Sequence, residues 1–304
     1  MILPPWCKQV MMMIKEFLDY LRFEKNRSAL TVKNYGKDLM AFEEFFRLLE
    51  PQLSWESIDS NIIRDWMESM MDRGNNATSI NRRLSALRSF YRFALTRGLV
   101  DKDPTITIVG PKKKKPLPQF VKESEMDALL DFKLEGTQYK DVLAHTLVET
   151  FYCTGMRLAE LIGLDDASID FVHQSLKVLG KRNKERYMPF GAELKESLQY
   201  YVSIRDEQVQ RQSTAFFVDK DGQRLTHNQV RYAVNKCLST VTTLKKRTPH
   251  VLRHTFATAM MNHGAGLESV QQLLGHQSLT TTEVYTHTTF EQLKRVYMKA
   301  HPRA

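Results

Sequence analysis

The sequence predicts a mainly helical protein of two domains, with one small antiparallel sheet in the second domain. Its 304 residues suffice for two domains of ordinary size, at about 100–200 residues each. Apolar residues recur three or four positions apart over most of the chain, which is typical of helices. Residues 109–118 interrupt this spacing with three prolines and four consecutive lysines, so they predict an exposed linker between the domains.

The first domain, residues 1–108, is expected to consist of four helices. Apolar residues three or four apart mark one face of the first helix within residues 10–21 and of the second within residues 39–49. A third helix is expected near residues 60–71, and a fourth begins around residues 78 and 79. Arginines occupy the remaining faces of the fourth helix, which is therefore expected to present a basic stripe.

The second domain, residues 119–304, is also expected to be helical, with one exception. Residues 168–190 alternate between apolar and polar side chains and contain a turn-like segment, Gly180–Lys184, which predicts a small antiparallel sheet with a hairpin. The helical spacing resumes at Thr226 and continues to the end of the sequence.

Composition excludes several classes of protein. Hydrophobic residues make up 42% and charged residues 26% of the chain, which are ordinary values for a globular protein. No apolar run reaches the ~18 residues that a membrane span needs, and the first ten residues lack the apolar stretch of a secretory signal. Cys7, Cys153 and Cys237 lie far apart, so neither a disulfide framework nor a zinc site is indicated. We expect a soluble, cytoplasmic protein.

The distribution of charge favours a nucleic acid as the partner. The chain has 44 Lys and Arg against 35 Asp and Glu, a net charge of +9. Residues 73–100 and 222–267 contain no acid, although helices normally intersperse both signs. Such runs suit a face that meets an anionic polymer; a solvated basic face without a partner is the alternative. The residues expected to contact nucleic acid are Arg82, Arg83, Arg88, Arg92, Lys112, Lys113, Lys114, Lys115, Lys245, Lys246 and Arg247.

Motifs for nucleotide or metal cofactors are missing from the sequence. It contains no glycine-rich phosphate-binding loop of the GxxxxGK[ST] kind, no GxGxxG and no HExxH. The basic half of the second domain also lacks the paired carboxylates that hold the ions of two-metal nucleases. We therefore expect no cofactor, no ATP use and no metal.

His250 and Arg253 are the first candidates for chemistry. They stand three residues apart, so on a helix they share a face, and Pro249 just before them suits a helix start. Arginine matches phosphate oxygens, and histidine exchanges protons near neutral pH. A buried structural histidine and an ion-paired arginine are the alternative. His250 and His254 also have metal-ligand spacing, but no carboxylate or cysteine nearby completes such a site.

Arg157 and Lys181 are further candidates. Arg157 lies at an expected helix start after a glycine, where a buried ion pair with Glu160 is an equally good interpretation. Lys181 projects from the expected hairpin and could reach into a groove, although most hairpin lysines are simply solvated.

His276 and Tyr285 follow near the end of the chain. A tyrosine hydroxyl has a pKa near 10, so it becomes a nucleophile only beside cations and a proton acceptor. Tyr285, nine residues after His276, is one of eleven tyrosines and would mean little without the other candidates.

Taken together, the candidates form an ordered set: Arg157, Lys181, His250, Arg253, His276 and Tyr285. In its order and approximate spacing, this set resembles the catalytic residues of the tyrosine recombinases, the phage integrase family. The stretches TGMRLAELIGLD, GKRNKERYMPF, HVLRHTFATAM and LLGHQSLTTTEVYTH are most similar to the Xer group (XerC/XerD-like). The resemblance spans the whole chain. It implies a SAM-like core-binding domain in residues 1–108 and a mixed α/β catalytic domain in residues 119–304, which together form a C-shaped clamp around double-stranded DNA.

The resemblance also implies a mechanism. Tyr285 would attack a DNA phosphodiester and form a 3′-phosphotyrosyl link. Lys181 would protonate the leaving 5′-oxygen, and His250 would accept the tyrosine proton. The partner strand's 5′-hydroxyl would then reverse the attack, so that strands are exchanged without ATP or metal.

Three further residues would bind the phosphate. Arg157 and Arg253 would stabilise the charge on its non-bridging oxygens, and His276 would donate a hydrogen bond to it. Arg182 stands where relatives often have a turn glycine, which leaves open whether Lys181 or Lys184 is the catalytic lysine.

The partners implied are double-stranded DNA and a tetramer on two recombination sites, formed by one recombinase or together with a second related one. The final helix would dock on a neighbouring protomer through an apolar stripe of Phe290, Leu293, Val296 and Tyr297. A DNA-translocase activator of the FtsK type is an open partner, and no membrane is expected. Chromosome-dimer resolution is the expected role; a mobile-element integrase or transposase, a type IB topoisomerase-like enzyme and a non-catalytic DNA-binding regulator are the alternatives.

Overall fold

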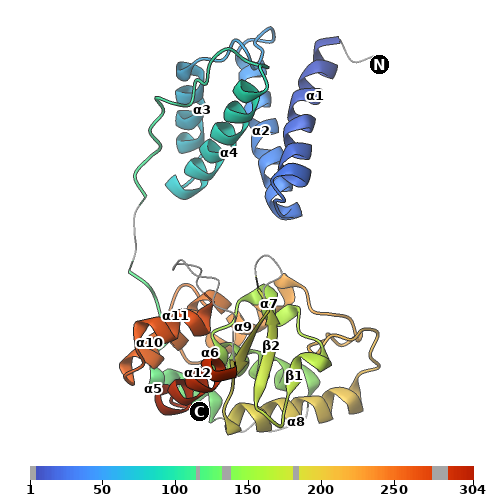
Figure 1. Ribbon diagram of the computed structural model, residues 1–304, viewed down its shortest axis with the longest axis vertical. Helices are drawn as coiled ribbons and strands as arrows, with labels where there is room; N and C mark the ends of the chain where they lie inside the picture. The colour runs from blue at the N-terminus through green and yellow to red at the C-terminus, as the bar shows by residue number, and fades with distance from the viewer. Residues whose placement is uncertain (1–4, 114–116, 132–137, 181–184, 276–286) are drawn as a thin grey trace. The chain divides into compact units, whose positions relative to one another are not determined.

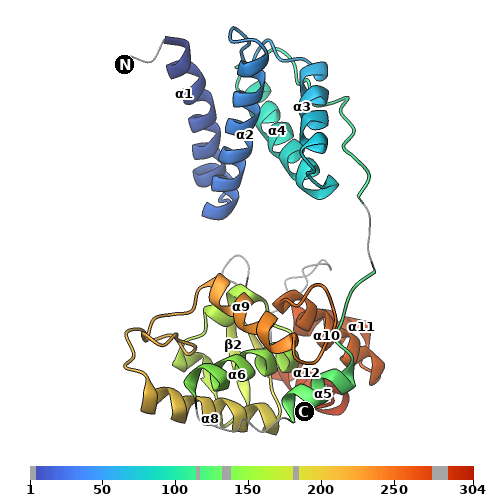
Figure 2. The ribbon, with the colours of Figure 1, turned by 180° about the vertical axis from the view of Figure 1, so that it is seen from behind.

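The chain folds as two compact units, residues 1–116 and residues 117–304 (Figures 1 and 2). The computed structural model describes residues 5–113, 117–131, 138–180, 185–275 and 287–304. No helix within these ranges is both long enough and apolar enough to cross a membrane. The prediction of a mainly helical protein with one small antiparallel sheet is confirmed.

Helices α2, α3 and α4 of the first unit begin at capping residues. The elements are α1 (Pro5–Asp19), a π-helical turn η1 (Tyr20–Glu24), α2 (Ala29–Leu49), α3 (Ser60–Asp72) and α4 (Ala77–Thr96). The side chains of Ser28, Asp59 and Asn76 accept hydrogen bonds from the first backbone N–H groups of α2, α3 and α4. The Asn76 cap explains why α4 begins at Ala77, just before the start that its apolar spacing indicates.

An aromatic core fixes the orientation of α4. Trp55, in the segment between α2 and α3, is fully buried, with ring centroids 5.6 Å from Phe42 and 4.5 Å from Phe90. The hydroxyl of Tyr91 donates a hydrogen bond of 3.1 Å to the carbonyl of Trp55. Since Phe90 and Tyr91 both point inward, the neighbouring face of α4 that carries Arg92 stays exposed.

The second unit surrounds a buried central helix, α6 (Tyr139–Thr154). Residues on nearly every face of α6 are buried, and α8, α9 and α10 pack around it; Figure 2 shows it between α8 and α9. The other elements are α5 (Glu123–Leu130), α7 (Leu158–Ile162), a 3-10 turn η2 (Asp166–Ser168), β1 (Ile169–Asp170), β2 (Ser175–Leu179), β3 (Glu185–Pro189), α8 (Ala192–Gln208), α9 (His227–Leu238), α10 (Pro249–Asn262), α11 (Leu267–Leu274) and α12 (His287–Ala300).

The sheet has the order β1-β2-β3 and is antiparallel throughout. Leu176 pairs with Met188 and Val178 pairs with Arg186, and all four residues are buried. One buried position of β3 is therefore occupied by an arginine rather than by an apolar residue.

The last helix, α12, packs on its own unit. Leu293 and Tyr297 are buried with Phe256 and Met260 of α10, although the resemblance implied docking of this stripe on a neighbour. Beyond α12, the guanidinium of Arg303 pairs with three carboxylates: one within α5, one at the C-cap of α5 and one in α8. They belong to Asp127, Asp131 and Glu193. The C-terminal helix is thus anchored in its own chain.

A buried carboxyl in α6 predicts a pH-dependent stability. Burial raises the pKa of Glu149 to about 7, so the folded state holds a proton that the unfolded state loses above about pH 4.5. The contribution of Glu149 to stability should therefore fall as the pH rises from about 4.5 to 7. Burial also lowers the pKa of the adjacent His145, so their 3.8 Å contact is not an ion pair at neutral pH. Glu149→Gln should stabilise the protein by about 2–3 kcal/mol at pH 8 and little at pH 4.

Denaturant unfolding at both pH values measures this difference. Glu196→Gln, at an exposed position of α8, is the matched control and should change stability little at either pH. A gain for Glu149→Gln that is the same at pH 4 and pH 8 would contradict the shifted pKa.

Candidate active site

Among the described residues, three arginines from different elements gather around one buried glutamate. Arg157 is the N-cap of α7, Arg186 lies on β3 and Arg253 lies on α10. Glu160, in the first turn of α7, is only 6% exposed. Residues far apart in sequence thus form one charged cluster, which contains two of the six predicted catalytic residues.

Glu160 binds two of the arginines through both of its carboxylate oxygens. Its Oε1 accepts hydrogen bonds from Arg157 at 2.9 Å and from Arg186 at 2.7 Å. Its Oε2 accepts one from the backbone N–H of Arg157 at 2.7 Å and one from Arg186 at 2.9 Å. Burial alone would raise the pKa of Glu160, but the bonds and charge of Arg186 and Arg157 outweigh it and hold that pKa below its usual value. Glu160 is therefore ionised at neutral pH.

Arg253 is buried without a carboxylate partner among the described residues. Its guanidinium donates hydrogen bonds of 2.7 Å to the carbonyls of Gly155, after α6, and Leu274, at the end of α11. Burial, and next the charge of Arg157, lower the pKa of Arg253 to about 10, so it remains protonated at neutral pH. Both arginines hold the end of α11, since Arg157 also donates to the carbonyl of Gly275 at 3.1 Å.

Two glycines allow these close approaches. Gly155 ends α6 at φ +60°, and a Cβ there would lie 2.4 Å from the ring of Phe256. Gly275 ends α11 at φ +66°, where a Cβ would lie 3.0 Å from the guanidinium of Arg186. A larger residue at either position would be strained and would displace the carbonyls that the arginines bind.

The cluster carries surplus positive charge. Three guanidinium groups against one carboxylate leave two positive charges without a counterion among the described residues. Buried charges are costly unless they are compensated, so this arrangement fits a site that takes up an anion. The side chain of Arg157 is 42% exposed, which makes it accessible to such a ligand.

His250 and His254 lie together at the start of α10. Their Nε2 atoms are 3.2 Å apart, and Pro249 occupies the first turn of the helix. Burial, then the neighbouring His254 and Arg253, lower the pKa of His250, so its imidazole is neutral at pH 7 and can accept a proton. For the metal-site alternative, no third His, Cys, Asp or Glu joins the pair within the described residues.

Several predicted residues lie outside the described ranges. They are Lys181 and the alternative Lys184, His276, Tyr285, and Lys114 and Lys115 of the linker. Their roles stay predictions from the sequence. The described chain reaches their neighbours, because β2 ends at Leu179, β3 begins at Glu185 and Gly275 directly precedes His276.

The arginines of α4 are less free than their acid-free run suggested. Arg82 forms an ion pair with the buried Asp38 of α2, and Arg83 approaches the same carboxylate at 3.9 Å. Arg88 donates a hydrogen bond of 2.5 Å to the carbonyl of Ile108. Arg92 is exposed, and its side chain has no hydrogen-bond or carboxylate partner in the part of the chain described here. The acids that compensate this run come from other helices.

The other basic residues predicted to bind DNA are at the surface. Lys112, Lys113, Lys245 and Lys246 are exposed, and Arg247 is half-buried just before α10. The last three therefore lie next to the helix that carries His250.

Sequence reasoning missed Arg186. The signal that could have found it is its position in a strand where buried and exposed residues alternate, because Arg186 takes a place expected to be apolar. The sequence indicated its partner Glu160 only as a partner of Arg157.

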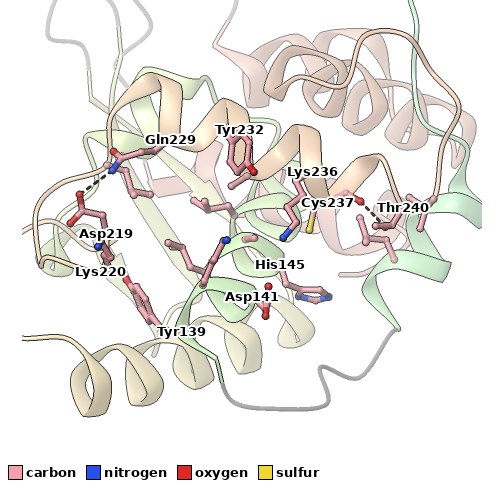
Figure 3. Close-up of a pocket in the computed structure, with 18 of the residues that line it drawn as sticks. Tyr139, Asp141, His145, Asp219, Lys220, Gln229, Tyr232, Lys236, Cys237 and Thr240 are labelled. Carbon is pink, nitrogen blue, oxygen red and sulfur yellow. Dashed lines mark hydrogen bonds between the residues drawn. The ribbon is translucent and has the colours of Figure 1, made fainter.

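A separate cavity of about 860 Å³ lies between α6 and α9 (Figure 3). Its lining is mostly apolar, and the polar side chains at it include His145, Tyr232 and Lys236. None of the clustered arginines lines it. The surplus positive charge, rather than this cavity, marks the candidate site.

Comparison with known proteins identifies the family. The Phage integrase family matches residues 119–292, and the Phage integrase, N-terminal SAM-like domain matches residues 14–98. A Tyrosine recombinase XerC of Staphylococcus saprophyticus is 38% identical over 288 residues, covering 95% of this chain and 96% of the relative. The chain belongs to the phage integrase family of tyrosine recombinases. A second relative, the Tyrosine recombinase XerC of Listeria welshimeri, is 35% identical over 294 residues, covering 95% of this recombinase and 97% of the relative.

Solved structures share the fold of this recombinase. The XerH site-specific recombinase bound to difH substrate, in its pre-cleavage complex, gives a TM-score of 0.67 at 20% identity, covering 93% of this chain and 83% of that chain. The Tn1549 transposon integrase in complex with a circular intermediate DNA gives a TM-score of 0.70 at 16% identity, covering 93% of this chain and 99% of that chain. At such identities the likeness concerns the fold alone.

Proposed function

We propose that this chain, a Xer-type site-specific tyrosine recombinase, exchanges DNA strands at a recognition site and so resolves chromosome dimers. The observation that carries the proposal is the surplus of two positive charges that the described residues leave beside Glu160, on a catalytic unit of the tyrosine recombinase family. A phosphodiester at the cluster would supply the missing negative charge. Arg157 and Arg253 would hold its non-bridging oxygens and stabilise the extra charge of the transition state.

Proton transfer completes the proposed reaction. The hydroxyl oxygen of Tyr285 attacks phosphorus, the bond to the 5′-oxygen breaks, and a 3′-phosphotyrosyl bond forms. His250 accepts the tyrosine proton, in keeping with its lowered pKa, while Lys181 protonates the leaving oxygen. His276 hydrogen-bonds the phosphate. The phosphotyrosyl bond retains the energy of the broken bond, so the 5′-hydroxyl of a second strand can reverse the attack without ATP or metal.

Double-stranded DNA is the partner, and we further propose that the recombinase acts as a tetramer on two sites in the cytoplasm. One or two related recombinases would form the tetramer, under the control of a DNA translocase of the FtsK type. We also propose that residues 1–108 and 119–304 are the two DNA-binding domains, joined by the basic linker 109–118.

Trapping of the covalent intermediate tests the proposal. The probe is a site selected for binding from random-sequence DNA, presented as duplexes in which a nick is moved stepwise along each strand. Where the nick lies a few nucleotides to the 3′ side of the cleaved bond, the released fragment diffuses away and the adduct persists. A covalent adduct is expected in EDTA.

Each alternative outcome identifies a rival function. Absence of an adduct at every nick position on DNA that the protein binds would favour a non-catalytic regulator. Adduct formation without joining of two differently labelled duplexes would favour a topoisomerase. An adduct that requires Mg²⁺ would contradict the metal-free mechanism.

Arg92 should contribute one phosphate contact. Arg92→Ala is expected to flatten the dependence of log K on log salt concentration by about 0.9, because one counterion fewer is released on binding. Gel-shift titrations across a range of salt concentrations measure the slope. Arg97→Ala, which removes an arginine already paired with Glu24 at 2.7 Å, is the matched control and should change the slope less. An equal change in both variants would contradict the role of Arg92.

A further inference from the structure

We propose that Arg186 is a positioning residue for DNA cleavage: it fixes the carboxylate of Glu160, which in turn holds the guanidinium of Arg157 at the phosphate. This inference rests on the proposed function. Arg186 itself is not expected to touch DNA, because it is only 6% exposed and is held on the buried side of β3.

The contact between Arg186 and Glu160 is geometrically specific. Two nitrogens of Arg186 meet the two oxygens of Glu160 at 2.7 and 2.9 Å, so the carboxylate cannot rotate without breaking a hydrogen bond. A buried ion pair contributes little to stability compared with well-packed apolar residues. An apolar side chain at this strand position, opposite Val178, would therefore satisfy the fold alone.

Arg157 depends on this fixed carboxylate. Its side chain is 42% exposed, whereas that of Glu160 is 4% exposed, so the buried partner sets the direction of the accessible one. Both oxygens of Glu160 are shared, because each binds Arg157 on one side and Arg186 on the other. Loss of Arg186 would remove two of these four hydrogen bonds and let Glu160 turn.

Arg186 also lies against the end of α11. A Cβ added to Gly275 would lie 3.0 Å from its guanidinium, so Arg186 occupies the space beside the residue whose carbonyl Arg157 binds. Arg253 binds the preceding carbonyl, of Leu274. One buried side chain thus binds Glu160 and lies beside Gly275, the two residues that hold Arg157.

The test measures covalent adduct formation by the full-length protein on the nicked duplexes, at saturating DNA, together with DNA affinity and melting temperature. Arg186→Met should slow cleavage roughly 10²-fold, since small misplacements of a binding group have effects of that size, while DNA affinity stays unchanged. Arg186→Lys keeps the charge but cannot span both carboxylate oxygens of Glu160. Compared with Arg186→Met, it should therefore restore the melting temperature more fully than the cleavage rate.

Lys177→Met is the matched control. It removes a basic partner from an exposed ion pair on the same sheet, with Glu185 at 3.0 Å, and should leave the cleavage rate unchanged. If Arg186→Met does not fold, the same measurements on Arg186→Lys still test the proposal.

A double-mutant cycle separates positioning from a structural role. If Arg186 acts through Arg157, adding either Arg186 variant to Arg157→Ala should slow cleavage no further. Additive losses, or Arg186→Lys with the wild-type rate, would overturn the positioning role. These failures differ from failure of the proposed function, in which the wild-type protein itself would form no adduct.

Discussion

Tyr285→Phe is expected to abolish covalent adduct formation on nicked DNA while binding to the same DNA persists. The substitution removes only the hydroxyl oxygen that would attack phosphorus, so the 3′-phosphotyrosyl bond should no longer form. The expected loss is complete within the sensitivity of a denaturing gel, which makes this the largest effect among our predictions. Gel shifts on intact duplex should show unchanged affinity.

Tyr200→Phe is the matched control, since Tyr200 is 43% exposed on α8 and has no proposed role in the reaction. This variant should form the adduct at the wild-type rate. An adduct that survives Tyr285→Phe would show that another residue is the nucleophile, and peptide mapping of that adduct would identify it.

Arg253→Lys should have the second largest effect, a loss of cleavage rate of about 10²–10³-fold at saturating DNA. Arg253 donates from two nitrogens to the carbonyls of Gly155 and Leu274, and a lysine cannot reproduce this fork. A comparable loss follows when one donor to a developing negative charge is removed from other enzymes. Arg253→Lys should lower the cleavage rate much more than the DNA affinity, because the transition state carries more charge on the bound oxygens than the ground state does.

Single-turnover cleavage and gel-shift affinity, measured on the same nicked duplex, test this separation. Arg231→Lys, at an exposed position of α9, is the matched control and should retain the wild-type rate. If Arg253→Lys weakened binding and cleavage equally, Arg253 would be an ordinary DNA-contacting arginine.

Local sequence signals predicted most of the fold. Proline at the start of α10, the glycine shortly before Arg157 at the start of α7, and apolar spacing in α2 and α4 act over a few residues, and the structure contains each helix they indicated. The alternation in residues 168–190 likewise predicted the sheet, since strand pairing there is between chain neighbours.

Pairing between distant residues could not be predicted in the same way. The acid-free run of α4 appeared uncompensated, but Arg82 pairs with Asp38, which lies 44 residues away in sequence. Arg186, which lies outside both acid-free runs, pairs with Glu160, 26 residues away. Counting charges along the chain therefore overstated the free positive charge on α4. It also left Arg186 unnoticed, although the strand alternation placed an arginine at a buried position.

The site could be predicted only in part, because some of its residues are close in sequence and others are distant. His250 and Arg253 share one helix face, so helical spacing alone brought them together. Arg157 joins them only because α6 and α11 end, and α7 begins, at one place, which depends on the packing of the whole unit. Both interpretations weighed for Arg157 are compatible with the structure, because its pairing with Glu160 leaves the side chain accessible.

The imbalance of charge around Glu160 has a consequence for the enzyme between reactions. Three guanidinium groups held near one carboxylate repel one another, and this repulsion opposes folding of the catalytic unit when no anion is present. A phosphate in the cluster removes that repulsion, so DNA occupancy and thermal stability are linked by mass action. The recombinase is expected to have its highest thermal stability when bound to its DNA substrate and its lowest while it searches for a site.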